Sequence, residues 1–207
     1  MLALFRVDPP ATRSREAKCQ HAGMSVDGYR AMTSALRDFL DLVATAGPGA
    51  DVDALTTDLR RWTDRLAPHR VDESRRVFGE RFDLPDRGQT MTPLFVPRLV
   101  TTVRAEGVAR FGEYFLGSNG AAHGGAVPLL FDEVLGHVVL ARGLRARTAY
   151  LHTEYRAITP IGRDLTVRAR VDRVSGRKLF LTAELSDGDA VCAESEALFV
   201  ELRDGAP

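Results

Sequence analysis

The chain has 207 residues, 44% of them hydrophobic and 27% charged, which is the composition of a globular protein with a packed core. Its 28 Lys and Arg residues balance its 28 Asp and Glu residues, so it lacks the basic excess that nucleic-acid binding requires. It contains no apolar run of about 18 residues, the length that would indicate a membrane span. Cys19 and Cys192 lie too far apart in sequence to indicate a disulfide framework, so we expect a cytoplasmic protein without metal or cofactor.

The first third of the chain predicts an arm followed by two helices. Residues 1–24 are polar and contain Pro9-Pro10, which is typical of a disordered arm. Residues 25–70 form a helical extension, whose second helix can be capped by Asp51 or Asp53. Apolar residues recur at three- and four-residue steps along both predicted helices: Tyr29, Met32, Leu36, Phe39, Leu40 and Val43, then Leu55, Leu59, Trp62 and Leu66. This hairpin contains no recognisable catalytic or binding motif, and we interpret it as a segment that serves packing or oligomerisation.

Residues 71–207 predict an α+β domain. After a turn-rich stretch over 69–93, strands are expected at 99–103 and 108–116 on either side of a break at Gly107, followed by a helix from about Gly124 to Arg142. Four further strands are expected at 148–157, 164–174, 178–186 and 190–201. The helix is apolar on nearly all sides and must be buried, so we predict a curved antiparallel sheet wrapped around one long central helix. An exposed edge strand of such a sheet is commonly protected by pairing in a dimer.

The predicted start of the central helix favours a site for a developing negative charge. Gly124 and Gly125 would allow a ligand to approach the backbone closely. The first N–H groups of a helix have no internal partner, and the helix dipole adds partial positive charge there. Such an end can polarise a carbonyl group and hold an oxyanion.

Asp132 is the candidate catalytic acid. It follows Gly125 by seven residues, which is two turns on nearly the same face and about 10 Å along the helix axis. It is flanked by Leu129, Leu130, Phe131, Val134 and Leu135. A carboxylate buried among such residues is costly unless it is paired or used. We therefore favour a functional role, in which Asp132 and the glycines act on one ligand, over a solvent-exposed or merely paired carboxylate.

Other polar side chains near this helix have simpler interpretations. Glu133 is expected to pair with an arginine or a backbone group, His123 to cap the helix or bond the loop backbone, and His137 to be structural. Ser118 and Ser195 lack the Gly-x-Ser-x-Gly turn of a serine hydrolase. The sequence contains no metal-ligand spacing and no phosphate loop.

The segment His123-Gly124-Gly125, with an acid nine positions after the histidine, resembles the hotdog-fold acyl-CoA thioesterases of the phenylacetate-pathway and thioesterase superfamily type. The resemblance covers roughly residues 95–202 and includes Tyr155 with Pro160 five residues later and the run Gly176-Arg177-Lys178. It implies hydrolysis of acyl-CoA in a homodimer or dimer of dimers, with the acyl chain in an apolar tunnel beside the helix.

The resemblance also implies roles for individual residues. Asp132 is the general base or the nucleophile, two routes that the sequence leaves open, and Gly124 and Gly125 polarise the thioester carbonyl. Thr148 positions the water and is expected from the opposite subunit, so that each active site is shared. The residues expected to contact substrate are His123 and Asn119 beside the helix, and Arg177 and Lys178 at the coenzyme A phosphates.

One departure from the family leaves rival functions open. Several relatives carry an amide side chain six residues before the histidine, where this chain has Gly117, and Asn119 stands two residues late. A non-catalytic acyl-CoA-binding or sensor protein is therefore the first rival. A hotdog hydratase or dehydratase is the second, although His123 and Asp132 would lie about 13 Å apart along an ideal helix, too far to act as a pair.

Overall fold

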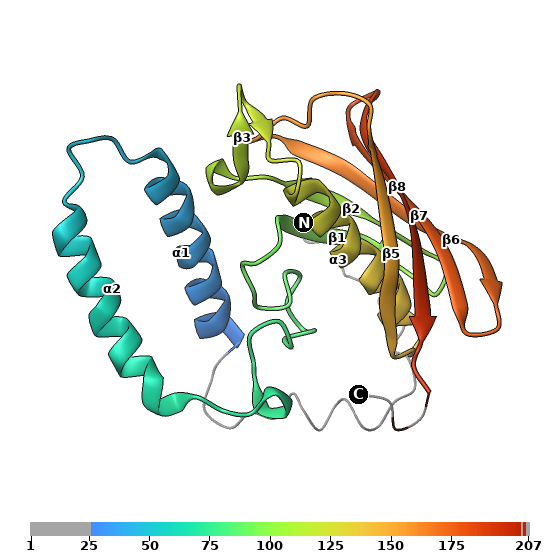
Figure 1. Ribbon diagram of the computed structural model, residues 1–207, viewed down its shortest axis with the longest axis horizontal. Coiled ribbons are helices and arrows are strands. Elements are labelled where there is room, and N and C mark those ends of the chain that lie inside the picture. The colour runs from blue at the N-terminus through green and yellow to red at the C-terminus, as the bar shows by residue number, and fades with distance from the viewer. Residues whose placement is uncertain (1–25, 204, 206–207) are drawn as a thin grey trace.

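The computed structural model describes residues 26–203 and 205, and the arm predicted over residues 1–24 lies outside them (Figure 1). Its main feature is a six-stranded sheet in the order β1-β2-β6-β7-β8-β5, in which every neighbouring pair is antiparallel. The strands are β1 (Leu94–Val100), β2 (Arg104–Arg110), β5 (Ala146–Tyr155), β6 (Asp164–Ser175), β7 (Lys178–Asp187) and β8 (Ala190–Glu201). The predicted antiparallel meander is therefore observed, with β1 and β5 at its edges.

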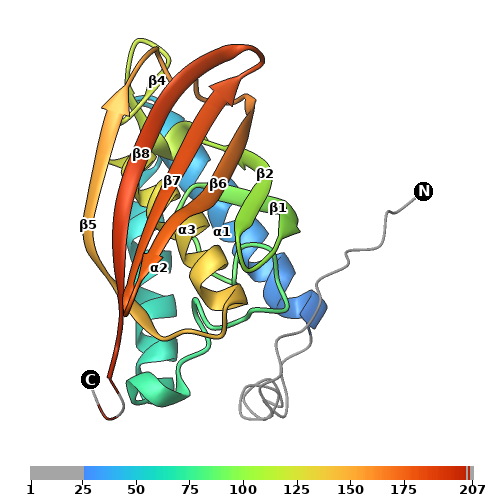
Figure 2. The same ribbon diagram turned by 90° about the vertical axis from the view of Figure 1, so that its right-hand side faces the viewer.

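The long apolar helix predicted at the centre is α3 (Ala126–Ala141), which lies in the hollow of the curved sheet (Figure 2). Half of its residues are buried, and it contacts every strand of the sheet. Its buried residues are Ala126, Val127, Leu130, Phe131, Val134, Leu135, Val138 and Val139. These side chains meet the inward faces of the strands, such as Leu165 and Leu181, and form one hydrophobic core.

The first two strands differ from the prediction. They span Leu94–Val100 and Arg104–Arg110, whereas strands were predicted at 99–103 and 108–116 with a break at Gly107. Gly107 instead lies within β2, where a Cβ atom would come within 2.5 Å of the Phe95 ring and the Val96 carbonyl oxygen. This glycine thus allows close packing of β1 on β2 and does not end a strand. After β2 the chain turns through η4 (Glu113–Phe115) into a small hairpin of β3 (Leu116–Ser118) and β4 (Ala121–Ala122).

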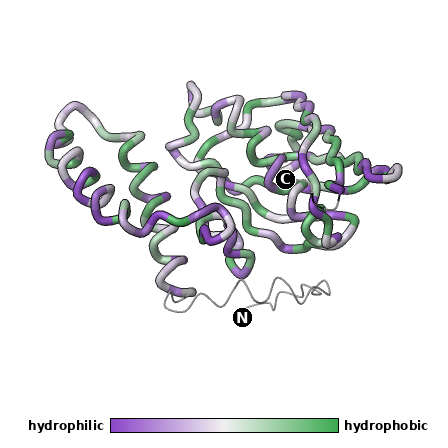
Figure 3. The backbone as a smooth tube through the Cα atoms, turned by 60° about the horizontal axis from the view of Figure 1, so that its bottom comes forward, coloured by the Kyte–Doolittle hydropathy of each residue, from purple (hydrophilic) through white to green (hydrophobic). Residues whose placement is uncertain are grey.

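The helical extension forms α1 (Val26–Thr45) and α2 (Val52–Leu66). Asp51 caps α2, because its side chain accepts a hydrogen bond from the Ala54 N–H at 2.9 Å. Helix α1 packs on η4, whereas α2 stands away from the sheet (Figure 1). Apolar and polar segments alternate along both helices (Figure 3). The chain then passes through two short turns, η2 (Ala67–His69) and η3 (Glu73–Arg75), before it reaches β1. No helix in the described part of the chain is long and apolar enough to cross a membrane.

Candidate active site

Helix α3 begins at an exposed turn formed by His123, Gly124 and Gly125. The His123 Nδ1 accepts a hydrogen bond from the Gly125 N–H at 3.0 Å, and the His123 carbonyl oxygen accepts one from the Ala126 N–H at 2.8 Å. Of the two interpretations of His123, the structure therefore shows the bond to the loop backbone, since the N-cap residue of α3 is Gly125 and no side chain caps the helix. The Gly124 N–H has no hydrogen-bond partner among residues 26–203, so it is the N–H of the glycine pair that can bind an oxyanion.

Tyr155, at the end of β5, holds this turn from the other side. Its hydroxyl donates a hydrogen bond of 2.5 Å to the Gly124 carbonyl oxygen. The peptide unit between Gly124 and Gly125 is thus held on both sides, its carbonyl oxygen by Tyr155 and its N–H by His123. The sequence had marked Tyr155 only as part of a family pattern, without a contact of its own.

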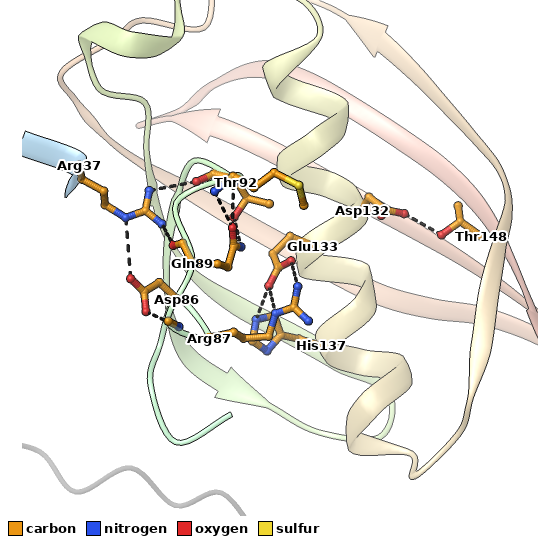
Figure 4. Close-up of polar contacts among 11 residues, drawn as sticks. Arg37, Asp86, Arg87, Gln89, Thr92, Asp132, Glu133, His137 and Thr148 are labelled. Atoms are coloured by element: carbon orange, nitrogen blue, oxygen red, sulfur yellow. Dashed lines mark hydrogen bonds and ion pairs between the residues drawn. The ribbon is translucent and has the colours of Figure 1, made fainter. Parts of the chain in front are cut away.

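Asp132 and Thr148 lie together on the face of α3 that looks toward β5 (Figure 4). The Thr148 hydroxyl donates a hydrogen bond of 2.7 Å to Asp132 Oδ1, the length of a bond to a charged acceptor. Asp132 is half-buried and Thr148 is exposed. The two residues belong to one chain, so the expectation that the opposite subunit supplies Thr148 to Asp132 is corrected.

A bulge in the edge strand accompanies this placement. The register of β5 on β8 shifts between Thr148, which pairs with Phe199, and Tyr150, which pairs with Leu198. Bulges change the direction of side chains and are common at sheet edges and beside active sites. Within the described sheet, β5 pairs only with β8, and none of its residues is buried. Its second edge and the site beside it therefore form an open surface.

Glu133, next to Asp132, points to the opposite side of α3 and belongs to an ion pair (Figure 4). Its two carboxylate oxygens accept hydrogen bonds of 2.6 Å from the Nε and Nη2 of Arg87, and the His137 Nε2 lies 3.5 Å from Oε1. Burial alone would raise the pKa of Glu133, but the hydrogen bonds and positive charge of His137 and Arg87 outweigh it, so this pKa is lowered. The expectation that Glu133 pairs with an arginine is confirmed.

A second polar cluster anchors helix α1 to the loop that carries Arg87. The Arg37 guanidinium donates hydrogen bonds to the Gln89 carbonyl at 2.6 Å and to the Thr92 carbonyl at 3.0 Å. Gln89 is 2% exposed, and its side chain donates to the Thr92 hydroxyl at 2.7 Å. Helix α1 is thus linked through this loop to α3 (Figure 4). Sequence reasoning missed Arg37, Arg87 and Gln89, which belong to no motif or periodic pattern.

The β3–β4 hairpin explains both Gly117 and Asn119. Asn119 and Gly120 have positive φ angles of 51° and 73° in a two-residue turn, a conformation that Asn-Gly favours. A Cβ atom on Gly117 would lie 3.0 Å from the His123 Cα, so a side chain here requires the active-site turn to move. Asn119 is exposed at the tip of this hairpin. Its role in substrate binding stays a prediction.

Arg177 and Lys178 lie far from the start of α3 in their own chain. Ala121, two residues before His123, bridges to Pro160, and strand β6 then leads away from this end of the sheet to the turn at Gly176. Both residues are exposed, and Arg177 also donates a hydrogen bond of 2.8 Å to the Glu201 carbonyl oxygen. Of the predicted site residues, the structure therefore brings Asp132 together with Thr148, and Gly124 together with His123, but not these two cations with either group.

Two cavities of the described chain lie elsewhere. One of about 600 Å³ is lined by charged side chains on the outer face of the sheet, such as Arg168 and Glu184, and one of about 200 Å³ lies between α1 and η4. Neither reaches Asp132, and neither is the apolar tunnel that the sequence predicted beside the helix. Any such tunnel requires a second surface over β5 and α3.

Comparison with known proteins gives the class of this domain. Residues 119–194 match the thioesterase superfamily. Acyl-coenzyme A thioesterase THEM4 of Mus musculus is 30% identical over 93 residues, which cover 44% of this chain and 40% of that protein. THEM4 of Bos taurus is 32% identical over 93 residues, covering 44% and 38%. The chain thus matches less than half the length of these curated relatives.

Solved structures agree with this assignment. A protein described as a thioesterase superfamily protein superposes with a TM-score of 0.70 at 26% identity and covers 86% of this chain and 91% of its own. A hypothetical thioesterase from Streptococcus pneumoniae, solved with coenzyme A, gives 0.50 at 16% identity over 52% and 87%, which shows the fold alone. The domain is a hotdog fold. The match of residues 119–194 to the thioesterase superfamily, together with this fold, bears out the resemblance noted in the sequence.

Proposed function

We propose that this protein hydrolyses acyl-CoA thioesters to a free acid and coenzyme A. The observation that carries the proposal is the Asp132 carboxylate, held by Thr148 at 2.7 Å on an open face of a thioesterase-type helix. The free N–H of Gly124, at the start of this helix in a second copy of the chain, supplies the donor that such a reaction needs. The curated relatives, which bear the name acyl-coenzyme A thioesterase, support the choice of substrate class.

The site is completed by a second copy of the chain. Gly124 and Asp132 are eight residues apart, about 12 Å along one helix, whereas an attacking water and its carbonyl carbon meet within about 3 Å. One chain's glycine turn and acid are thus too far apart for one thioester. Two-fold pairing of the free edges of β5 would set two α3 helices antiparallel and bring Gly124 of the partner subunit toward Asp132. The proposed active site is therefore still shared between two subunits, as the resemblance implied, but Asp132 and Thr148 come from the same subunit.

In the reaction, a water attacks the thioester carbon while Asp132 takes its proton. The negative charge that develops on the carbonyl oxygen is stabilised by the N–H of Gly124 and the helix N-terminus. The carbon–sulfur bond then breaks, and the coenzyme A thiolate leaves and takes up a proton. Direct attack by Asp132 would instead pass through an anhydride. A single turnover in ¹⁸O-water separates the routes, because hydrolysis of an anhydride at the Asp132 carbonyl places the label in the protein.

Substitution of Asp132 tests the proposal. Asp132→Asn should lower turnover by about 10²-fold or more in a thiol-release assay with acyl-CoAs of different length, the scale for loss of a positioned base. Asp164→Asn is the matched control, since Asp164 is an exposed acid in a surface pair with Arg110 and should leave the rate unchanged. Undiminished hydrolysis by Asp132→Asn would remove the residue from this role.

A non-catalytic acyl-CoA-binding protein is the second candidate. It is favoured by Gly117, because the side-chain amide of several relatives is absent and the space beside His123 leaves no room for one. Such a protein would bind acyl-CoA saturably and release no thiol. In either case Arg177 and Lys178 are proposed to contact the coenzyme A phosphates, and replacing both with alanine should raise KM, or Kd, without lowering kcat.

A further inference from the structure

Helix α2 exposes an apolar stripe that no residue within 26–203 covers. No residue of α2 is buried, although the helix is strongly amphipathic. Val52, Leu55, Leu59, Trp62 and Leu66 follow one another at alternating steps of three and four residues, the spacing of a helix–helix seam. Leu59 is 48% exposed and Trp62 is 57% exposed, so the central part of this stripe faces solvent in the described chain.

Helix α1 carries a second stripe with the same spacing. Met32, Leu36, Phe39 and Val43 again alternate by three and four residues. Another face of α1 is used within the chain, where Thr33 is buried and Arg37 binds the loop before β1. The two helices barely approach each other, and the hairpin is splayed (Figure 1). The hairpin therefore presents two seam-type stripes without a partner helix between them.

We propose that the α1–α2 hairpin packs against the same hairpin of a second copy of this chain. The four helices then form a bundle in which the stripe of α2 is buried. This association goes beyond the proposed hydrolysis and does not depend on it.

The charges on α2 favour a second copy over other occupants. The helix carries three aspartates and three arginines: Asp53, Asp58, Asp64, Arg60, Arg61 and Arg65. Such a balanced surface has no net attraction to an anionic membrane or a nucleic acid, which require a basic excess. It also causes no net repulsion between two copies, whose unlike charges can pair across the seam.

The size and place of the hairpin also suit self-association. The two helices have 20 and 15 residues and are each about 10 Å wide, so one face of the hairpin has an area of about 500 Å². Pairing of two such faces would bury about 1,000 Å² in total, which is the lower limit for a specific interface. In Figure 1, α2 lies beyond α1, at the end of the molecule away from the sheet, so nothing in the described chain stands over its outer side.

Trp62 provides the test, because it is the single tryptophan of the chain. In the purified full-length protein, its emission and its quenching by acrylamide are measured over a range of concentrations, with molecular mass followed by sedimentation. We expect Trp62 to be shielded in the associated protein. Leu59→Asp should expose it and raise the dissociation constant by about 10-fold or more, the effect of 1.4 kcal/mol. Leu66→Asp, at the end of the helix, should act in the same way.

Thr57→Asp is the matched control, since it adds the same charge to the opposite face of α2 and should behave as the wild type. Helix content by circular dichroism separates loss of association from loss of the helix. The proposal is overturned if Trp62 is equally accessible in wild type and Leu59→Asp. It is also overturned if Trp62 is shielded in protein that sediments as a monomer, because a segment of its own chain would then cover the stripe.

Discussion

The Thr148 hydroxyl donates a 2.7 Å hydrogen bond to Asp132 and thereby joins the edge strand β5 to the central helix α3. The bond fixes the carboxylate on the side of the helix that faces the free sheet edge (Figure 4). An acid and its positioning hydroxyl are thus already assembled in a single chain. A second subunit has to contribute only the N–H donors of its glycine turn to complete the proposed site.

Removing this hydroxyl should impair turnover. Thr148→Val keeps the shape of the side chain but loses the bond to a charged group, which contributes about 1.5–3 kcal/mol, or roughly 10- to 100-fold in rate. Most of the loss is expected in kcat, measured by thiol release, because Thr148 positions the reacting acid. Thr148→Ser retains the hydroxyl and should recover most of the activity. Equal rates for Thr148→Val and the wild type would show that the bond does not contribute.

The Arg87–Glu133 ion pair should contribute to stability on the other side of α3. The side chain of Glu133 is 8% exposed and that of Arg87 is 22% exposed. Glu133→Gln should lower the free energy of unfolding at pH 7 by about 3 kcal/mol, the lower end for breaking a buried pair, because Arg87 keeps partial access to water. Urea unfolding followed by circular dichroism measures this. Glu106→Gln, in an exposed pair with Arg104 at 3.7 Å, should cost less than about 1 kcal/mol.

The same pair gives a pH dependence with a defined sign. The pKa of Glu133 is lowered in the folded protein from its ordinary value of 4.5, because the bonds and charge of His137 and Arg87 outweigh burial. Its contribution to stability is therefore complete above pH 4.5 and is lost as the pH falls from there through the lowered pKa. The difference in stability between wild type and Glu133→Gln should shrink over that acidic window. A difference that stays constant from pH 7 to acid would contradict this assignment.

The parts of the fold that were predicted correctly are those that depend on residues close together in the sequence. The apolar run of α3 and the cap at Asp51 depend on neighbouring residues, and both were predicted from the sequence. The boundaries of β1 and β2 were not, because Gly107 is required by the ring of Phe95 on the adjacent strand.

In the candidate active site, too, the sequence predicted the residues but not the contacts that they make across the fold. Asp132 was a candidate from its position on the apolar helix and Thr148 from family resemblance, but their contact within one chain depends on the register of β5 on β8. The sequence predicted an arginine partner for Glu133 without identifying it. Arg87 is 46 residues away in the chain, and nothing periodic relates the two. Contacts of this kind depend on the assembled fold, which no local pattern encodes.

Gly117 should be required for the geometry of the glycine turn. In Gly117→Ala the new methyl group would meet the His123 Cα at 3.0 Å and the His123 nitrogen at 3.2 Å, so the backbone must move. We expect a loss of about 1–2 kcal/mol in stability, as for other forced contacts, and a fall in kcat as the Gly124 N–H is displaced. Gly47→Ala is the control, because its Cβ would meet no atom within 4 Å. If Gly117→Ala matches Gly47→Ala in both stability and kcat, the glycine turn is not sensitive to this contact.

Tyr155 should position Gly124 without taking part in the chemistry. Its hydroxyl donates the 2.5 Å bond to the Gly124 carbonyl oxygen, so Tyr155→Phe loosens the residue whose own N–H, in the preceding peptide unit, faces the proposed oxyanion. Because the carbonyl is exposed and can bond water instead, the loss of stability should be about 1 kcal/mol or less. The loss in kcat should be several-fold, roughly the effect of 1 kcal/mol on the barrier, with little change in KM. Tyr114→Phe, at a tyrosine that is 52% exposed on η4, should leave kcat unchanged. Should both variants turn over at the wild-type rate, the hydroxyl of Tyr155 does not hold the oxyanion donor in place.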